Sequence, residues 1–164
     1  MTHAVEIRPA RRDEYDALGQ LTLEAYRTVG PQSPEYEAEL LDVAHRAEYA
    51  RVLVAVDEGG TLLGGLTLVP PGPNPLSEHR EPEAGSMRML AVASAARGRG
   101  VGEALTRFAM EELRAAGAST MVLHSATDMT VAHRLYRRLG FVRDESLDWV
   151  PEPDVELLGF RLAL

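Results

Sequence analysis

The sequence of 164 residues predicts an α/β (α+β) fold in which helices pack on one mixed sheet. Short runs with strand character alternate with runs that carry the helical spacing of apolar residues, in the order β-α-α-β-β-β-α-β-α-β-β. That order gives about seven strands and about four helices. The apolar fraction of 45% is sufficient for a folded core, and the length fits a single domain over residues 1–164 without an internal repeat.

The first half of the chain predicts three strands and two helices. Residues 5–8 form a short strand that the following proline ends. Residues 12–26 have apolar side chains on one helical face. A second helix is expected over residues 34–47, because Ser33 is a favourable N-cap and proline suits the first turn. The stretch RVLVAVDEGGTLLGGLTLV, residues 51–69, predicts two strands joined by a glycine turn.

The second half of the chain alternates in the same way. The expected elements are, in order, a loop at 70–85, a strand at 86–92, a helix at 101–116, a strand at 119–125, a helix at 129–139, and strands at 141–150 and 155–164. Asp128 is expected to cap the helix that follows it, and Gly140 to end that helix. Pro151 and Pro153 are expected to separate the last two strands.

The composition narrows the classes of function. A formal net charge of −8 disfavours nucleic acid and anionic membranes as partners. Without cysteine, the chain has no disulfide, no thiolate metal site and no cysteine nucleophile, and we expect no metal. The N-terminal stretch MTHAVEIRPARRDEYD lacks the apolar run of a signal peptide, and no segment approaches membrane-spanning length. We therefore expect a cytoplasmic protein.

The stretch LAVASAARGRGVG, residues 90–102, places three glycines at alternate positions between a strand and a helix. The first N–H groups of a helix lack partners within the helix, and together with the helix dipole they form a site for a phosphate group. The glycines leave the backbone without side chains that would keep a phosphate away. Arg97 and Arg99 are able to add charge-assisted hydrogen bonds to phosphate oxygens.

A glycine-rich turn without a ligand is the simpler interpretation, because short glycine motifs often match by chance. Two known phosphate-binding motifs fit poorly. The dinucleotide motif G-x-G-x-x-G requires a third glycine where Glu103 stands, and the P-loop requires a lysine that this stretch lacks. A nicotinamide-dependent oxidoreductase is therefore disfavoured.

The motif that fits is R/Q-x-x-G-x-G/A, filled by residues 97–102, and with it the sequence resembles the GCN5-related N-acetyltransferase (GNAT) superfamily. The resemblance covers MRMLAVASAARGRGVGEALTRFAMEELRAAG and TMVLHSATDMTVAHRLYRRLGFV, which lie between Met87 and Val142. It implies a mostly antiparallel central sheet of the GNAT type and an acyltransferase that uses acetyl-CoA.

By this resemblance, acetyl-CoA is the acetyl donor. The backbone of Leu90, Ala91 and Val92 would bind the pantetheine arm as an added strand does, and an N–H at or near Val92 would hold the oxyanion. The pyrophosphate would lie on Arg97, Gly98, Arg99, Gly100, Val101 and Gly102. Many relatives contact the cofactor arm with an asparagine at the position of Met129, which has no amide for this contact.

Tyr136 stands in the pattern A-x-x-x-Y-x-x-x-G-F, which runs from Ala132 to Phe141. Its apolar helical face alone indicates a core tyrosine. The resemblance instead implies that Tyr136 is the general acid that protonates the departing thiolate. A phenol, with a pKa of about 10, is able to supply this proton to a thiolate whose thiol has a pKa of about 8.5.

The general base is not evident from the sequence. Many relatives carry a glutamate where this chain has Ser86, and a serine does not accept a proton from an ammonium group near neutral pH. The candidates are Glu81, Glu83 and His124, with a water chain or no base as further alternatives. Imidazole ionises in the useful range, but a lone histidine in a strand is more often structural.

The sequence thus predicts an N-acetyltransferase that moves the acetyl group of acetyl-CoA to a primary amine by direct attack in a ternary complex. The acceptor is expected to be a small molecule or a peptide, and the glutamates of the loop at 70–84 are compatible with a cationic one. The alternative is a non-catalytic acyl-CoA-binding sensor module, which the missing glutamate and asparagine favour. The C-terminal strands are able to pair in a homodimer.

Overall fold

The computed structural model describes residues 4–164 as eight strands and five α-helices, with three short 3-10 helices. The strands form one mixed, mostly antiparallel sheet in the order β1-β2-β3-β4-β5-β8-β6, with β7 paired to β8. The predicted α/β class is confirmed. The chain forms two compact units, one made of the residues up to 68 and 89–109, the other of 69–88 and 110–164. Residues 1–3 of the predicted domain lie outside the described part.

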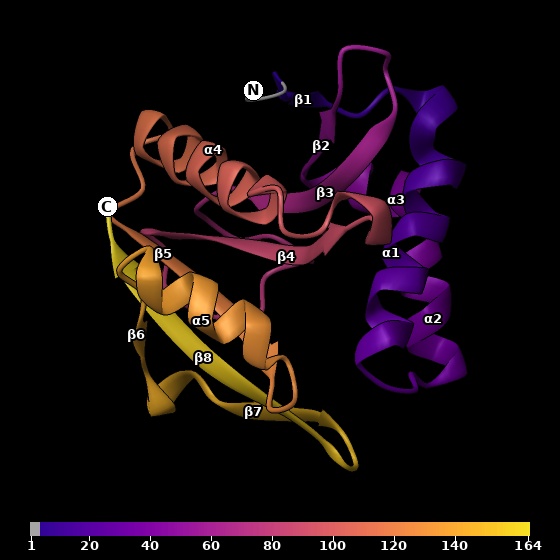
Figure 1. The fold of residues 1–164 in the computed structure, drawn as a ribbon. Helices are drawn as coiled ribbons and strands as arrows, with labels where there is room; N and C mark the ends of the chain where they lie inside the picture. Colours follow the sequence, from indigo (N-terminus) through magenta and orange to yellow (C-terminus); the bar gives the residue numbers. More distant parts are fainter. Residues whose placement is uncertain (1–3) are drawn as a thin grey trace. The chain divides into compact units, whose positions relative to one another are not determined.

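The first unit contains the strands and helices of the N-terminal part of the chain (Figure 1). They are β1 (Glu6–Pro9), α1 (Tyr15–Val29), α2 (Pro34–Leu41), α3 (Val43–Tyr49), β2 (Arg51–Val56) and β3 (Leu62–Val69). β1, β2 and β3 pair antiparallel, which confirms the two strands predicted around the glycine turn. Leu18 of α1 and Val43 of α3 pack with Val54 of β2, so the apolar faces of these helices close the core of the unit.

The single helix predicted over residues 34–47 is wrong, because the chain breaks at Asp42. This residue has φ −87° and ψ 68°, outside the helical region, and its side chain accepts a hydrogen bond from the His45 N–H at 3.1 Å. Aspartate competes with helix continuation through such bonds and caps the next helix instead. The predicted cap of α2 is confirmed, since Ser33 accepts from the Tyr36 N–H at 3.1 Å.

A bidentate ion pair ties the end of β1 to the beginning of α1. The helix predicted from residue 12 starts as a 3-10 turn (Arg12–Glu14), and the last residue of that turn binds back to the strand. Nη1 and Nη2 of Arg8 each donate to the Glu14 carboxylate at 2.8 Å, and the Arg11 N–H donates to it at 2.8 Å. The bond from Arg8 is the main reason why the pKa of Glu14 falls to about 2.

Glu14→Gln is expected to lower the free energy of unfolding by about 1–2 kcal/mol near neutral pH. The carboxylate pKa is depressed in the folded state, so its stabilisation is present above the unfolded pKa of about 4.3 and disappears as the pH falls toward 2. Urea unfolding of both proteins across this range measures the effect. A difference that stays constant down to the most acidic point would show that the ion pair is not its source.

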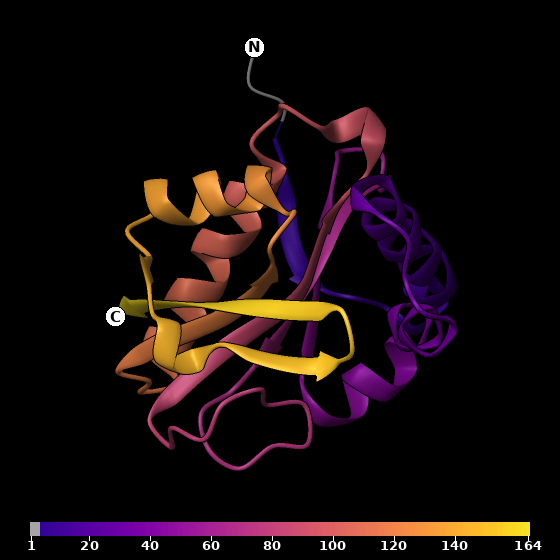
Figure 2. The ribbon, with the colours of Figure 1, turned by 90° about the horizontal axis from the view of Figure 1, so that it is seen from below.

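The second unit contains most of the C-terminal half of the chain. Its elements are β5 (Thr120–Ala126), α5 (Thr130–Arg138), β6 (Val142–Arg143), β7 (Trp149–Glu152) and β8 (Val155–Ala163), with the beginning of β4 (Ala84–Val92) and the end of α4 (Val101–Ala115). β5 runs parallel to β4 over three residue pairs and antiparallel to β8 along its whole length. β7 and β8 form a hairpin, drawn in yellow in Figure 2.

The strand predicted over residues 141–150 is wrong. The segment contains two short strands, β6 and the beginning of β7, separated by a 3-10 turn (Glu145–Leu147). Asp144 caps this turn by accepting from the Ser146 N–H at 3.0 Å. Pro151 does not break the chain, because it lies within β7, which pairs with β8 at the edge of the sheet, and an edge position tolerates proline.

The predicted cap at Asp128 is also wrong. The N-cap position of α5 belongs to Met129, without a side-chain hydrogen bond, and Asp128 contributes its backbone carbonyl to the Thr130 N–H at 2.9 Å. Helix α5 itself is confirmed. No helix among residues 4–164 is long and apolar enough to cross a membrane. The cytoplasmic location stays a prediction.

Candidate functional site

The glycine run forms an exposed loop between β4 and α4 in the first unit. After β4 ends at Val92, a 3-10 turn (Ser94–Ala96) leads to Gly98 and Gly100, whose φ angles are +75° and +76°. Residues with a side chain rarely adopt this left-handed conformation. A Cβ atom at either glycine would meet no atom within 4 Å, so the space above the loop is open. Glycine is therefore required by the backbone conformation and not by crowding.

The beginning of α4 directs free N–H donors toward this loop. The first bond of the helix runs from the Ala104 N–H to the Gly100 carbonyl at 3.0 Å. The N–H groups of Val101 and Gly102 therefore have no acceptor within the helix. Val101 is buried and fixes the turn to the core of the unit. Donors at the N-terminus of a helix of 15 residues suit a phosphate group.

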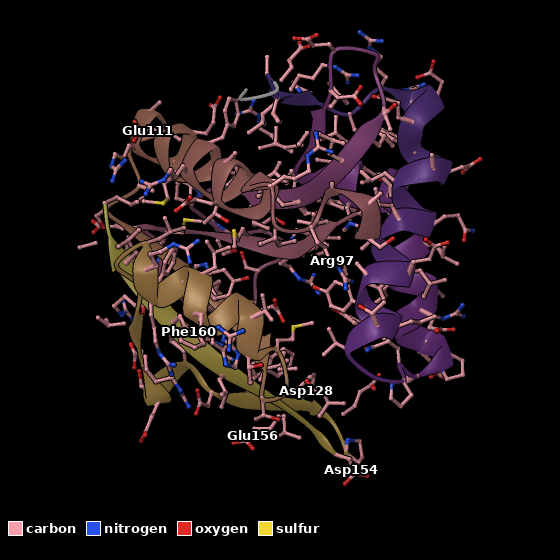
Figure 3. The ribbon with its side chains drawn as sticks, in the orientation of Figure 1. Arg97, Glu111, Asp128, Asp154, Glu156 and Phe160 are labelled. Atoms are coloured by element: carbon pink, nitrogen blue, oxygen red, sulfur yellow. The ribbon has the colours of Figure 1, made fainter. Side chains whose placement is uncertain are left out.

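Two arginines flank Gly98. Arg97 donates from Nη2 to Thr28 Oγ1 near the end of α1 at 2.8 Å, which fixes its guanidinium group beside the loop (Figure 3). Arg99 is exposed and, within residues 4–164, has no ion-pair partner. The two cations, the free N–H groups and the open space fit the charge and the acceptor oxygens of a diphosphate.

β4 has an irregular backbone just before the residues expected to bind the pantetheine arm. Met89 has φ +55°, a conformation that costs a residue with a side chain about 1–2 kcal/mol. Its side chain is buried against α1 and α2, so packing holds the strained conformation. After it, Ala91 is buried, whereas Leu90 and Val92 are half-buried. The binding of the pantetheine arm by these three residues stays a prediction.

Tyr136 lies on α5, and its ring is buried in the second unit. It contacts Phe141 and Phe160 with ring centroids 5.7 and 5.9 Å apart. Burial raises the pKa of Tyr136 well above its ordinary value, so the phenol stays protonated. Its hydroxyl has no hydrogen-bond partner among the described residues, which leaves the proton available to a ligand. The ring packs in the core, as the apolar helical face indicates, and its protonated hydroxyl is compatible with the general acid that the resemblance implies.

Met129 occupies the N-cap of α5, where its thioether accepts a weak bond from Ser125 Oγ at 3.6 Å. Ser125 Oγ is in turn 3.1 Å from His133 Nε2. This chain of contacts fixes the beginning of the helix with no amide at the position. The contact of Met129 with a cofactor stays a prediction.

The two carboxylate candidates for the base differ in their surroundings. Glu81 forms a bidentate ion pair with Arg161, one bond of which measures 2.9 Å. That pairing lowers the pKa of Glu81, which makes it a weaker proton acceptor. Glu83 is exposed before the first residue of β4, and Ser119 Oγ lies 3.5 Å from its carboxylate.

His124 is half-buried on β5. Its Nε2 is 2.8 Å from the Leu147 carbonyl and therefore carries the proton in the neutral ring, which leaves Nδ1 as an acceptor. The Trp149 ring lies edge-on to the imidazole at 6.5 Å. Neighbouring residues of a strand point to opposite faces, so His124 lies on the face of β5 and β8 away from Phe160 and Tyr136.

Sequence reasoning missed three polar atoms of the second unit. Ser77 Oγ, His79 Nε2 and Ser86 Oγ are buried without a hydrogen-bond partner. No local pattern marks them, because their burial depends on how the loop before β4 folds over the sheet. Within residues 4–164, no group of three or more histidine, aspartate or glutamate side chains is placed to hold a metal ion.

Comparison with known proteins gives the same family as the glycine loop. The family model described as "Acetyltransferase (GNAT) family" matches residues 15–141. A mycothiol acetyltransferase from Pseudarthrobacter chlorophenolicus is 39% identical over 95 residues, which are 57% of this chain and 28% of that protein. The chain therefore spans well under half the length of this curated relative.

Two solved structures are similar over nearly the whole chain. A GCN5-related N-acetyltransferase from Kribbella flavida is 27% identical with a TM-score of 0.73, covering 98% of both chains. A GNAT-family acetyltransferase from Brucella melitensis, in complex with acetyl-CoA, is 26% identical with a TM-score of 0.65, covering 99% of this chain and 89% of that chain. The family match includes the glycine loop and Tyr136 and extends over more than half of the sequence. The chain belongs to the acetyltransferase (GNAT) family.

Proposed function

We propose that this chain is an acetyl-CoA-dependent N-acetyltransferase whose acceptor is a primary amine. The observation that supports it most is the loop at Gly98 and Gly100. Left-handed backbone, free N–H groups of α4 and two arginines meet there, in a chain of the acetyltransferase family. These groups would hold the pyrophosphate of the donor, which supplies an activated thioester.

The transfer has to move two protons. The ammonium group of the acceptor gives one proton to a base, and the free amine then attacks the acetyl carbonyl. Tyr136 protonates the departing thiolate, and the second proton of the amine nitrogen restores the phenol. The products are an amide, a free thiol and one proton on the base. A backbone N–H at or near Val92 would stabilise the oxyanion. No covalent enzyme intermediate is needed, as suits a chain without cysteine.

The geometry favours His124 as the base over Glu81. Its Nδ1 has a free lone pair, whereas the Glu81 carboxylate is bound by Arg161. Simultaneous binding of both substrates lowers the entropic part of the barrier.

The identity of the acceptor has less support. Two of the loop glutamates are neutralised by arginines, because Glu78 is 3.1 Å from Arg88 and Glu81 is paired with Arg161. These two carboxylates therefore offer little attraction to a cationic acceptor. The similarity to mycothiol acetyltransferases makes small amines related to mycothiol the first acceptors to test, followed by peptide N-termini and lysine side chains.

An amine panel with acetyl-CoA tests this proposal. Thiol release should rise at least about tenfold above background with one or more of the amines, and mass spectrometry should find one acetyl group on that amine. CoA should raise the Tm, and a nicotinamide dinucleotide should not. Tight binding of CoA without turnover on any amine would contradict the proposal and favour the sensor module.

A further inference from the structure

Three unpartnered polar atoms lie under one loop of the second unit. Ser77 Oγ, His79 Nε2 and Ser86 Oγ are each buried without a hydrogen bond to any atom of residues 4–164. The Ser86 side chain is only 4% exposed. Buried polar groups in folded proteins are nearly always paired, and where protein atoms do not pair them an ordered water does.

The register of the sheet places Ser86 and His124 on the same face. Ser86 pairs with Val122 on β5, and Val122 pairs with Arg161 on β8. Side chains at matched positions of paired strands point to the same side, and side chains two residues apart on one strand do too. His124 and Arg161 therefore share the face that Ser86 occupies, away from α5.

The loop before β4 is fastened across this face at two points. Arg88, two residues after Ser86, forms an ion pair with Glu78 at 3.1 Å, with its Nη1 3.4 Å from the Leu76 carbonyl. On β8, Arg161 binds Glu81. The residues between these two points, Ser77 and His79 among them, are thereby held over the strands that carry Ser86 and His124.

The hydrogen bonds fix the state of both imidazoles. His79 Nδ1 accepts from the Glu81 N–H at 3.1 Å, so the proton of the neutral ring is on Nε2, the buried and unpartnered atom. His124 is in the opposite state. Its Nε2–H donates to the Leu147 carbonyl, so its Nδ1 is an acceptor that needs a hydrogen-bond donor. A water molecule is able to accept from His79 and donate to His124.

We infer that His79 and Ser86 hold a buried water molecule that passes the proton of the acceptor amine to His124. The inference rests on the proposed function. The water accepts from His79 Nε2–H and from the ammonium group, and donates to Ser86 Oγ and to His124 Nδ1. As the amine loses its proton to the water, the water gives one of its own to His124, and no charge remains on the water. His79 is a positioning residue, since its only free atom is a donor.

The surroundings keep His79 in this donor state. Burial is the main cause that lowers its pKa, and the charges of Arg161 and His124 act in the same direction, against Glu81. Asp148 is a charged neighbour of His124. A neutral His79 therefore persists through the pH range in which the amine must be deprotonated.

Kinetics of variants test the relay. His79→Leu and Ser86→Ala should each lower kcat about tenfold or more near neutral pH, with the KM for acetyl-CoA unchanged. The loss should shrink at high pH or with an acceptor whose ammonium pKa lies below the assay pH, because such an amine needs no base. His79→Gln keeps an N–H donor and should recover part of the rate. His45→Gln, at an exposed histidine of α3, is the matched control. A rate loss equal for all amines and pH values would overturn the relay.

A second measurement does not depend on turnover. In the protein without ligands, 15N NMR should find His79 protonated on Nε2, with a cross-peak from that proton to a long-lived water, and Ser86→Ala should weaken the cross-peak. Its absence would overturn the water site itself. If the water is present and no amine is acetylated, the proposed function fails and the relay with it, whereas a missing water in an active enzyme overturns the relay alone.

Discussion

Tyr136→Phe is expected to lower kcat about a hundredfold or more and to leave the Kd for CoA unchanged. The substitution removes only the hydroxyl, so the contacts of the ring with Phe141 and Phe160 are kept and folding should be preserved. Steady-state kinetics with the best amine of the panel, together with calorimetric titration of CoA, measure the two quantities. The hydroxyl makes no hydrogen bond among the described residues, so its loss leaves no other group unpaired.

Tyr15→Phe in α1 is the control for removal of a phenol hydroxyl elsewhere in the chain. Thermal melting of both variants should stay close to that of the wild type. Equal losses of turnover and CoA affinity in Tyr136→Phe would assign the ring to packing and leave the departing thiolate without an assigned acid.

Gly100→Val is expected to raise the Kd for CoA about tenfold or more, the reverse of the tyrosine result. Valine is strongly disfavoured at the φ of +76° found here, so the loop must leave this conformation and its N–H groups no longer converge. The open space around this residue means that no clash with the protein contributes. Gly102→Val tests the first turn of α4 by a different route, because Gly102 lies within the helix and the added side chain would keep a phosphate away from the N–H groups there.

Gly60→Val is a closely matched control. Gly60 belongs to the β2–β3 turn, has φ +84°, and likewise has no atom within 4 Å of a Cβ. Both variants should lose similar stability in thermal melting, and only Gly100→Val should lose CoA affinity. Unchanged affinity in Gly100→Val would contradict the pyrophosphate site, and with it the main support for the proposed function.

The sequence predicted correctly those elements that are determined by interactions between residues close together in the chain. The alternation in residues 51–69 predicted β2 and β3, and the Ser33 cap was read correctly because its partner is three residues away. The glycine loop was found for the same reason. Two predictions of elements were wrong. The apolar stripe of the second helix continues past Asp42, but the helical backbone stops there. The predicted strand at 141–150 is divided by a turn whose flanking residues, Asp144 and Asp148, bind β8.

The candidate site was predictable in part for the same reason. A motif pointed to Tyr136 and the loop, but nothing near Glu81 in the sequence indicates its ion pair with Arg161. The burial of His79 and Ser86 likewise depends on contacts between the loop and distant strands. The left-handed backbone at Met89 has no marker either, since glycine or asparagine is the usual residue there.

The division of the chain has a practical consequence for protein engineering. The chain passes from one compact unit to the other after residues 68, 88 and 109, and these three passages lie inside β3, β4 and α4. Neither unit is a continuous piece of sequence, so no truncation at a single point yields one of them whole. Split reporters or isotope-labelled halves made by ligation would therefore have to be refolded together, and a gene fragment that ends near residue 110 should give insoluble product.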